Sequence, residues 1–182
     1  MVNLNEAKGF LTDNFLCVLR RTRRLYVELA RQDELLKSEG RAHGYFEPVL
    51  LCICWCDFLG ALYLGEGKAD DKRRIVQWLK GPMASQNALY RKHASKIHQA
   101  YRNGLAHGFQ PNWFNISYDE RDHHLVVNGQ IIKIDVPTLI DDMIAAVKDF
   151  ASKLCEKPGV TPPRPGSVEA FTHAARELKI QV

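Results

Sequence analysis

The sequence predicts a mainly α fold, a four- to five-helix up-down bundle with a small β-hairpin inserted before the last long helix. Apolar residues recur at spacings of three and four over most of the chain, which is the period of an amphipathic helix. This pattern changes at residues 113–134, where strands are expected from Trp113 to Tyr118, from His124 to Val127 and over 130–134. The last two flank Asn128-Gly129, a strong two-residue hairpin signal. The 182 residues fit one domain, and 46% hydrophobic with 25% charged residues excludes disordered and collagen-like proteins.

The first helix is predicted over residues 4–38, and Gly40 follows it. Arginines fill the faces that the apolar residues leave free. Its run Arg20-Arg21 and Arg23-Arg24 is expected to be a solvated surface, with an extended phosphate-binding surface as the alternative. The apolar stripe of this helix consists of Leu11, Phe15, Val18, Leu19, Tyr26, Leu29 and Leu36.

The second helix begins at Glu47 and Pro48 and ends at Gly65. It is apolar nearly all round, which predicts a central position in the bundle. The segment is shorter than the roughly 20 residues that cross a bilayer. Asp57 lies at its middle, where membrane insertion of a carboxylate costs about 3 kcal/mol. We therefore expect a core helix and no membrane association.

Two further helices precede the hairpin. Asp70 and Asp71 suit the start of a short helix, which Gly81-Pro82 ends, and a longer helix is predicted from Ser85 to Leu105. The apolar stripe of the longer helix is Tyr90, Ala94, Ile97, Tyr101 and Leu105. Its adjacent polar stripe is Arg91, Ser95, His98 and Arg102.

The last long helix begins after Asp135, a preferred N-cap residue, with Pro137 in its first turn. The helical domain is expected to cover residues 1–156, followed by a Pro-rich linker at 157–166 and a short tail helix within 167–182. The inward-facing residues of the last long helix are Leu139, Ile140, Met143, Ile144, Val147, Phe150 and Leu154.

The five cysteines include no CxxC pair, which favours buried reduced thiols over disulfides or a thiolate metal site. Helical spacing puts Cys52 and Cys56 on one face and Cys54 nearly opposite them. His123 and His124 are adjacent in a predicted strand, so they point to opposite faces and cannot grip one metal. No signal peptide is visible, and we expect a cytoplasmic protein without a metal or cofactor.

The net charge of +4 is unevenly placed. Residues 72–118 hold eight Lys or Arg and no Asp or Glu, which leaves 17 basic and 21 acidic residues, or −4, in the rest of the chain. The same stretch holds several aromatic residues. Basic side chains neutralise phosphates and aromatic rings stack on unpaired bases, so this mixture favours single-stranded nucleic acid. The alternative is a solvated face that meets acidic patches of the same molecule or a partner.

Residues 101–109, YRNGLAHGF, contain the candidate chemistry. Arg102 is a permanent cation, and His107 titrates near neutral pH. Such a pair can cleave RNA without a metal, because the arginine holds the scissile phosphate while the histidine transfers a proton. In the structural alternative, Arg102 is salt-bridged at the helix C-terminus and His107 caps the last carbonyls.

Arg102, Asn103 and His107 resemble the Arg-x4–6-His motif of the HEPN family (higher eukaryotes and prokaryotes nucleotide-binding domain). The apolar second helix with its central acid is similar too, and the resemblance covers about residues 4–154. It implies a helical bundle, a homodimer with a composite active site, and metal-independent RNA cleavage that leaves a 2′,3′-cyclic phosphate. It also implies a toxin–antitoxin or defence system, with an antitoxin protein as a partner.

On this hypothesis Arg102 holds the phosphate and His107 acts as acid or base. Asn103 orients one of them. The side chains expected to line the RNA approach are Arg91, Ser95 and His98. The rival hypothesis is a non-catalytic helical module that uses its basic face to bind a nucleotide, RNA or a protein.

Asp57 allows two interpretations, because a carboxylate in an apolar helix should be paired. It either orients Arg102 or His107 from behind, or makes a hydrogen bond to another helix or occupies a half-exposed position.

Overall fold

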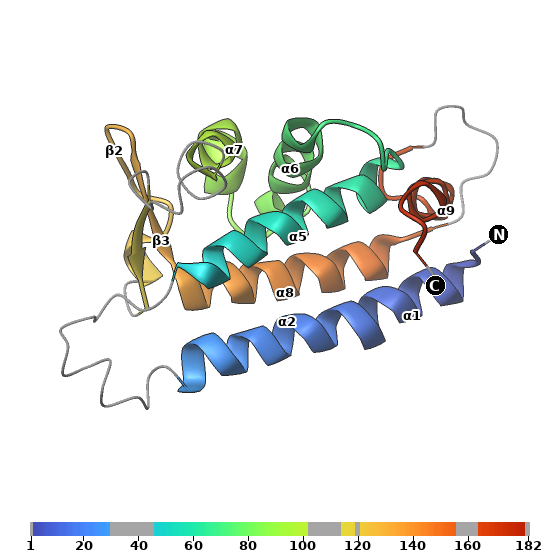
Figure 1. The fold of residues 1–182 in the computed structure, drawn as a ribbon, viewed down its shortest axis with the longest axis horizontal. Coiled ribbons are helices and arrows are strands. Elements are labelled where there is room, and N and C mark those ends of the chain that lie inside the picture. The colour runs from blue at the N-terminus through green and yellow to red at the C-terminus, as the bar shows by residue number, and fades with distance from the viewer. Residues whose placement is uncertain (1, 30–45, 102–113, 119–120, 156–163, 181–182) are drawn as a thin grey trace.

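The computed structural model describes residues 2–29, 46–101, 114–118, 121–155 and 164–180. They form a helical bundle with a small three-stranded sheet directly before the last long helix (Figure 1). The predicted mainly α fold, with its β insertion at this place in the chain, is confirmed.

The first helix runs without a break from Leu4 to Leu29, as α1 (Leu4–Gly9), η1 (Phe10–Phe15), α2 (Leu16–Arg23) and η2 (Arg24–Leu29). Asn3 and Glu6 form a reciprocal capping box at its start. The segments η1 and η2 are π-helical, so they contain more residues per turn than an α-helix.

These π turns change which side chains of the first helix face the core. Across the second of them the buried positions are five residues apart, from Thr22 to Val27, and at the end of the first both Phe15 and Leu16 are buried. The prediction that Val18 belongs to the buried stripe is wrong, since 47% of this residue is exposed. A prediction that assumes α-helical spacing throughout therefore assigns the wrong residues to the buried face after a π turn.

Helix α5 (Glu47–Leu64) is central, as expected, and packs against α6 (Asp71–Lys80), α8 (Val136–Lys153) and α9 (Val168–Glu177). It ends at Gly65, which adopts a left-handed conformation with φ of 78°. Among the described helices, α5 is the one long and apolar enough to cross a membrane by length and composition, and 56% of that stretch is buried inside the bundle.

Helix α6 begins as predicted, because the Asp70 side chain accepts a hydrogen bond from the Arg73 amide. The next helix, α7 (Leu89–Ala100), begins four residues later than expected from Ser85. A 3-10 turn, η3 (Met83–Ser85), intervenes, and the Asn87 side chain then accepts from the Leu89 amide. The predicted end of this helix at Leu105 lies outside the described residues.

The sheet has the strand order β1 (Phe114–Ser117), β3 (Ile131–Asp135), β2 (Val127–Asn128). Strands β2 and β3 form the predicted antiparallel hairpin, but Asn128 pairs with Ile131, so its two-residue turn is Gly129-Gln130 and not the expected Asn128-Gly129. The φ of Gly129 in this turn is 57°. Strand β1 pairs with β3 in parallel, in a register that places Phe114 opposite Ile132. The expected strand from His124 to Val127 is mostly absent, because a 3-10 turn, η5 (Arg121–His123), leads directly into a buried His124.

Helices α8 and α9 complete the core. Asp135 caps α8 as predicted, accepting from the Thr138 amide at 3.1 Å. Helix α9, capped by Ser167, packs on α5 and α1 and buries Phe171 completely. His173 donates from Nδ1 to the Gly65 carbonyl at 2.7 Å. The predicted tail helix is therefore part of the same core, whereas residues 157–163 of the expected linker lie outside the described part of the chain.

Candidate nucleic-acid interface

Helices α6 and α7 carry the described basic residues of the acid-free segment. They pack side by side (Figure 1), and each turns its apolar residues inward. Ser95 and several cations stay exposed on their outer sides. We refer to Lys72, Arg73, Lys80, Arg91, Lys92 and Ser95 as the α6/α7 face. The amphipathic pattern of the two helices thus collects dispersed charges on one pair of neighbouring helices.

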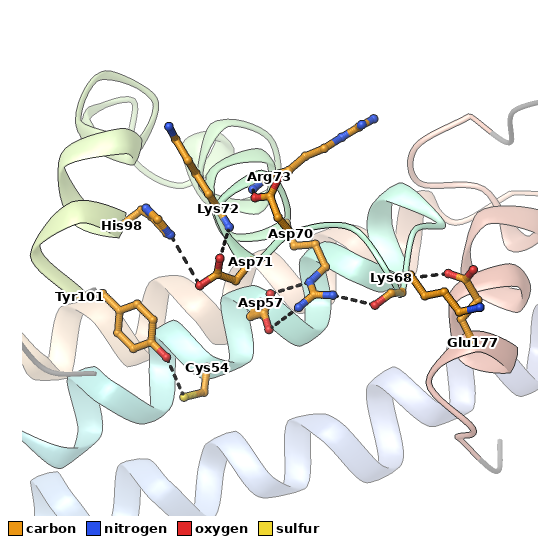
Figure 2. Close-up of polar contacts among 12 residues, drawn as sticks. Cys54, Asp57, Lys68, Asp70, Asp71, Lys72, Arg73, His98, Tyr101 and Glu177 are labelled. Carbon is orange, nitrogen blue, oxygen red and sulfur yellow. Dashed lines mark hydrogen bonds and ion pairs between the residues drawn. The ribbon is translucent and has the colours of Figure 1, made fainter. Parts of the chain in front are cut away.

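The predicted site residues Arg91 and Ser95 both lie on this face, whereas His98 does not. Only 8% of His98 is exposed, and its Nε2 atom lies 3.8 Å from Oδ2 of Asp71 at the start of α6 (Figure 2). The expectation that His98 lines an RNA approach is wrong for this structure. Ser95 and His98 lie only about 60° apart around α7, so the ring is buried because it faces Asp71 at the start of α6.

Asp57 is bound by Arg74 of α6. The guanidinium donates from Nε to Oδ1 at 2.6 Å and from Nη2 to Oδ2 at 2.9 Å. Its Nη1 atom donates to the Gly67 carbonyl at 2.6 Å. Of the two interpretations of Asp57, the structure shows the interhelical hydrogen bond (Figure 2). The alternative contact with Arg102 or His107 falls outside the described residues.

Tyr101, at the C-terminal end of α7, faces α5. Its hydroxyl lies 3.8 Å from Sγ of Cys54, as Figure 2 shows. Burial, and then the neighbouring Cys54, raise the pKa of the Tyr101 hydroxyl to about 12. The hydroxyl is therefore neutral at pH 7. Tyr101 is the last described residue before the motif.

The candidate catalytic residues Arg102, Asn103 and His107 lie outside the described residues. The structure describes what precedes them: an exposed basic helix surface and a polar contact at Tyr101. Their expected roles stay predictions.

A buried polar chain that sequence reasoning missed joins α7, the sheet and α8. The Asp135 amide donates to Nδ1 of His124, whose Nε2 lies 2.8 Å from the Tyr90 hydroxyl. That hydroxyl donates to Oδ2 of Asp142 at 3.0 Å. Because Nδ1 accepts, the proton of the neutral ring sits on Nε2 and is donated to Tyr90. The sequence feature that could have indicated this chain is the carboxylate of Asp142, which directly precedes the core residue Met143.

Burial lowers the pKa of His124 to about 4 and raises the pKa of the Asp142 carboxyl. The imidazole is thus neutral at pH 7. Neutral His124 donates one hydrogen bond and accepts another, and these bonds hold the sheet against α7 and α8. The ring is not suited to exchange protons near neutral pH.

The described cysteines follow the predicted faces, since Cys52 and Cys56 are buried while Cys54 is exposed. Within the described ranges, no three His, Cys, Asp or Glu side chains gather as a metal-binding group. Comparison of the chain with protein-family models, curated proteins and solved structures finds no match.

Proposed function

We propose that this chain is a HEPN-like, metal-independent endoribonuclease that binds RNA on its α6/α7 face. The observation that supports it most is the exposure of five cations on two neighbouring helices, one of which leads directly into Arg102 and His107. Phosphate contacts of this kind supply most of the affinity of proteins for single strands.

The ion pairs on α6 indicate which cations of this surface are available to a ligand. Arg74 is fully engaged by Asp57 and the Gly67 carbonyl, and Arg73 lies 2.7 Å from Glu66. Lys72, Lys80 and Lys92 have no ion pair with any described residue, so their charges stay available to phosphates.

In the proposed reaction the Arg102 guanidinium neutralises the scissile phosphate, and Asn103 orients the reacting pair. His107 takes the proton of the 2′-hydroxyl, whose oxygen attacks phosphorus. The bond from phosphorus to the 5′-oxygen breaks, that oxygen takes a proton from water, and protonated His107 returns its proton to the solvent. The products are a 2′,3′-cyclic phosphate and a 5′-hydroxyl, and no metal or redox partner is consumed.

The proposal also covers the oligomeric state, the protein partner, the biological role and the location of the chain. A homodimer would bring two motifs together, and sedimentation velocity of the purified chain measures that state. An antitoxin protein partner, a role in defence and a cytoplasmic location complete the proposal, with no membrane association.

The experiment incubates the wild-type chain, Arg102→Ala and His107→Ala with a mixed RNA pool in EDTA and determines the product ends. Cleavage by the wild type alone, leaving cyclic phosphate ends, is the expected result. Salt-sensitive RNA binding without cleavage would contradict the enzyme hypothesis and favour the rival hypothesis of a non-catalytic binding module. A protein that neither binds nor cleaves RNA would contradict the proposal.

A further inference from the structure

A cavity of about 340 Å³ lies where the C-terminal ends of α5, α6 and α8 meet the starts of α7 and α9. Its volume is within the range of about 300–1,000 Å³ that small-molecule sites occupy. Gly81 and Ser85 line it from the turn between α6 and α7, and Ser167 lines it from the start of α9. The cavity shares Arg91 with the α6/α7 face.

One wall of the cavity is aromatic. The rings of Tyr63 and Phe150 meet edge to face, with centroids 5.9 Å apart and an interplanar angle of 78°. Among the described residues, the Tyr63 hydroxyl has no hydrogen-bond partner. A Cβ at Gly81 would lie 3.2 Å from this hydroxyl, so the glycine leaves it uncovered. The wall thus offers apolar ring surface with one polar group beside it.

Three other side chains that line the cavity are charged. Arg91 donates from Nε to the Lys80 carbonyl at 3.3 Å, which holds the guanidinium while its terminal nitrogens have no described partner. Nζ of Lys153 lies 2.7 Å from Oδ2 of Asp149. Two cations and one carboxylate therefore line the cavity, and Oδ1 of Asp149 stays available as an acceptor.

We propose that this cavity binds one unstacked nucleotide of an RNA strand. Arg91 and Lys153 take its phosphate, because both are cations at the cavity wall. The base lies against Tyr63, whose ring packs on the buried Phe150, as unstacked RNA bases do on aromatic side chains. Asp149 accepts hydrogen bonds from the edge of the base. Guanine is the expected base, since it presents two adjacent N–H donors on one edge.

This inference rests on the proposed function, because Arg91 belongs to both surfaces. Arg91 and Ala100 are nine residues apart on α7, which is about 14 Å along the helix axis. A single strand can thus occupy the cavity while it extends along α7 toward the motif. The cavity would then select a guanine a few nucleotides from the scissile bond.

The test titrates GMP and UMP into the full chain by isothermal titration calorimetry. GMP is expected to bind at least tenfold more tightly than UMP. Arg91→Ala should weaken GMP binding at least tenfold, whereas Lys92→Ala should leave it within twofold. The two variants remove the same charge at adjacent exposed positions, and only Arg91 lines the cavity.

Two further variants separate the base from the phosphate. Asp149→Asn should bring GMP and UMP affinities to within threefold of each other, and Ser85→Leu should weaken both by filling the cavity from an exposed position. Absence of GMP binding, or equal losses in Arg91→Ala and Lys92→Ala, would overturn the proposal.

Competition identifies the source of the nucleotide. A guanine-containing oligoribonucleotide should displace GMP, and oligouridine should not. If no RNA displaces bound GMP, the cavity takes a free nucleotide and the proposal of a strand-binding site is wrong. His107→Ala should keep full GMP affinity, so loss of cleavage and loss of nucleotide binding are separate results.

Discussion

The carboxylate of Asp57, in the middle of the apolar helix α5, receives two hydrogen bonds from the guanidinium of Arg74, at 2.6 and 2.9 Å. The side chain of Arg74 is only 16% exposed. The pair explains how an otherwise apolar core helix tolerates a charge, because each group satisfies the other where water is scarce.

Asp57→Ala should lower the free energy of unfolding by about 1.5–3 kcal/mol, because it removes two of the three hydrogen bonds of the partly buried Arg74 guanidinium. Glu66→Ala is the matched control. It unpairs Arg73, whose side chain is 56% exposed and is hydrated by solvent, so the loss should stay below about 1 kcal/mol. Urea unfolding measures both, and equal losses would contradict the structural account.

Gly60→Ala should destabilise the protein by about 1–3 kcal/mol, since overpacking forces neighbouring groups to move. A Cβ at Gly60 would lie 2.2 Å from the Arg74 carbonyl oxygen, so α5 and α6 would have to separate. Gly9→Ala is the comparison, because its Cβ would meet its nearest atom at 3.6 Å. That variant should gain about 0.5–1 kcal/mol from helix propensity. Thermal unfolding of the two variants decides whether this close packing exists.

The buried His124 should make stability depend on pH. Burial lowers its pKa from 6.5 to about 4, so as the pH falls the unfolded chain binds the proton first. The stabilisation is complete above pH 6.5 and is lost between pH 6.5 and 4. A pKa difference of this size corresponds to about 3 kcal/mol.

Asp142 acts in the opposite direction, because its raised pKa makes the folded protein take up that proton first. The comparison of wild type with His124→Gln isolates the histidine. Urea unfolding at several pH values between 7 and 4 should show a steeper loss for the wild type. Parallel curves for the two proteins would argue against a buried neutral imidazole.

RNA binding by the α6/α7 face should weaken with salt. Each phosphate contact to a single strand contributes about 0.7 to the slope of log K against log salt. Lys80→Ala in a His107→Ala background should therefore lower the magnitude of that slope by about 0.7. Lys148→Ala, an exposed cation on α8 outside the face, should leave the slope unchanged. Fluorescence anisotropy with a labelled oligoribonucleotide measures both, and similar slopes for all variants would place the RNA elsewhere.

Local signals in the sequence predicted the helices and the hairpin. Asp70 and Asp135 cap helices where expected, whereas the turn of the hairpin is Gly129-Gln130, one residue after the expected Asn128-Gly129. The parallel pairing of β1 with β3 was not predictable in this way, because it joins distant segments without a local turn. The exposure of Val18 escaped prediction for another reason, since two π turns shift the period of the first helix.

The exposure of the candidate site residues was predicted in part, and their function stays a prediction. Helical spacing correctly placed Arg91 and Ser95 on an exposed surface, but it could not show that His98 faces Asp71 on a neighbouring helix. The partner of Asp57 and the chain from Tyr90 through His124 to Asp142 likewise depend on tertiary packing. Spacing within one helix carries no information about the residues that another element brings to it.

The central claim is that Arg102 and His107 cleave RNA, and the initial cleavage rate in EDTA tests it most directly. His107→Ala should cleave about 10²–10⁴ times more slowly than the wild type, because proton transfer by a positioned side chain contributes a factor of this size. His93→Ala removes the same ring from α7 and should stay within about threefold. A His107→Ala protein that cleaves as fast as the wild type would contradict the account.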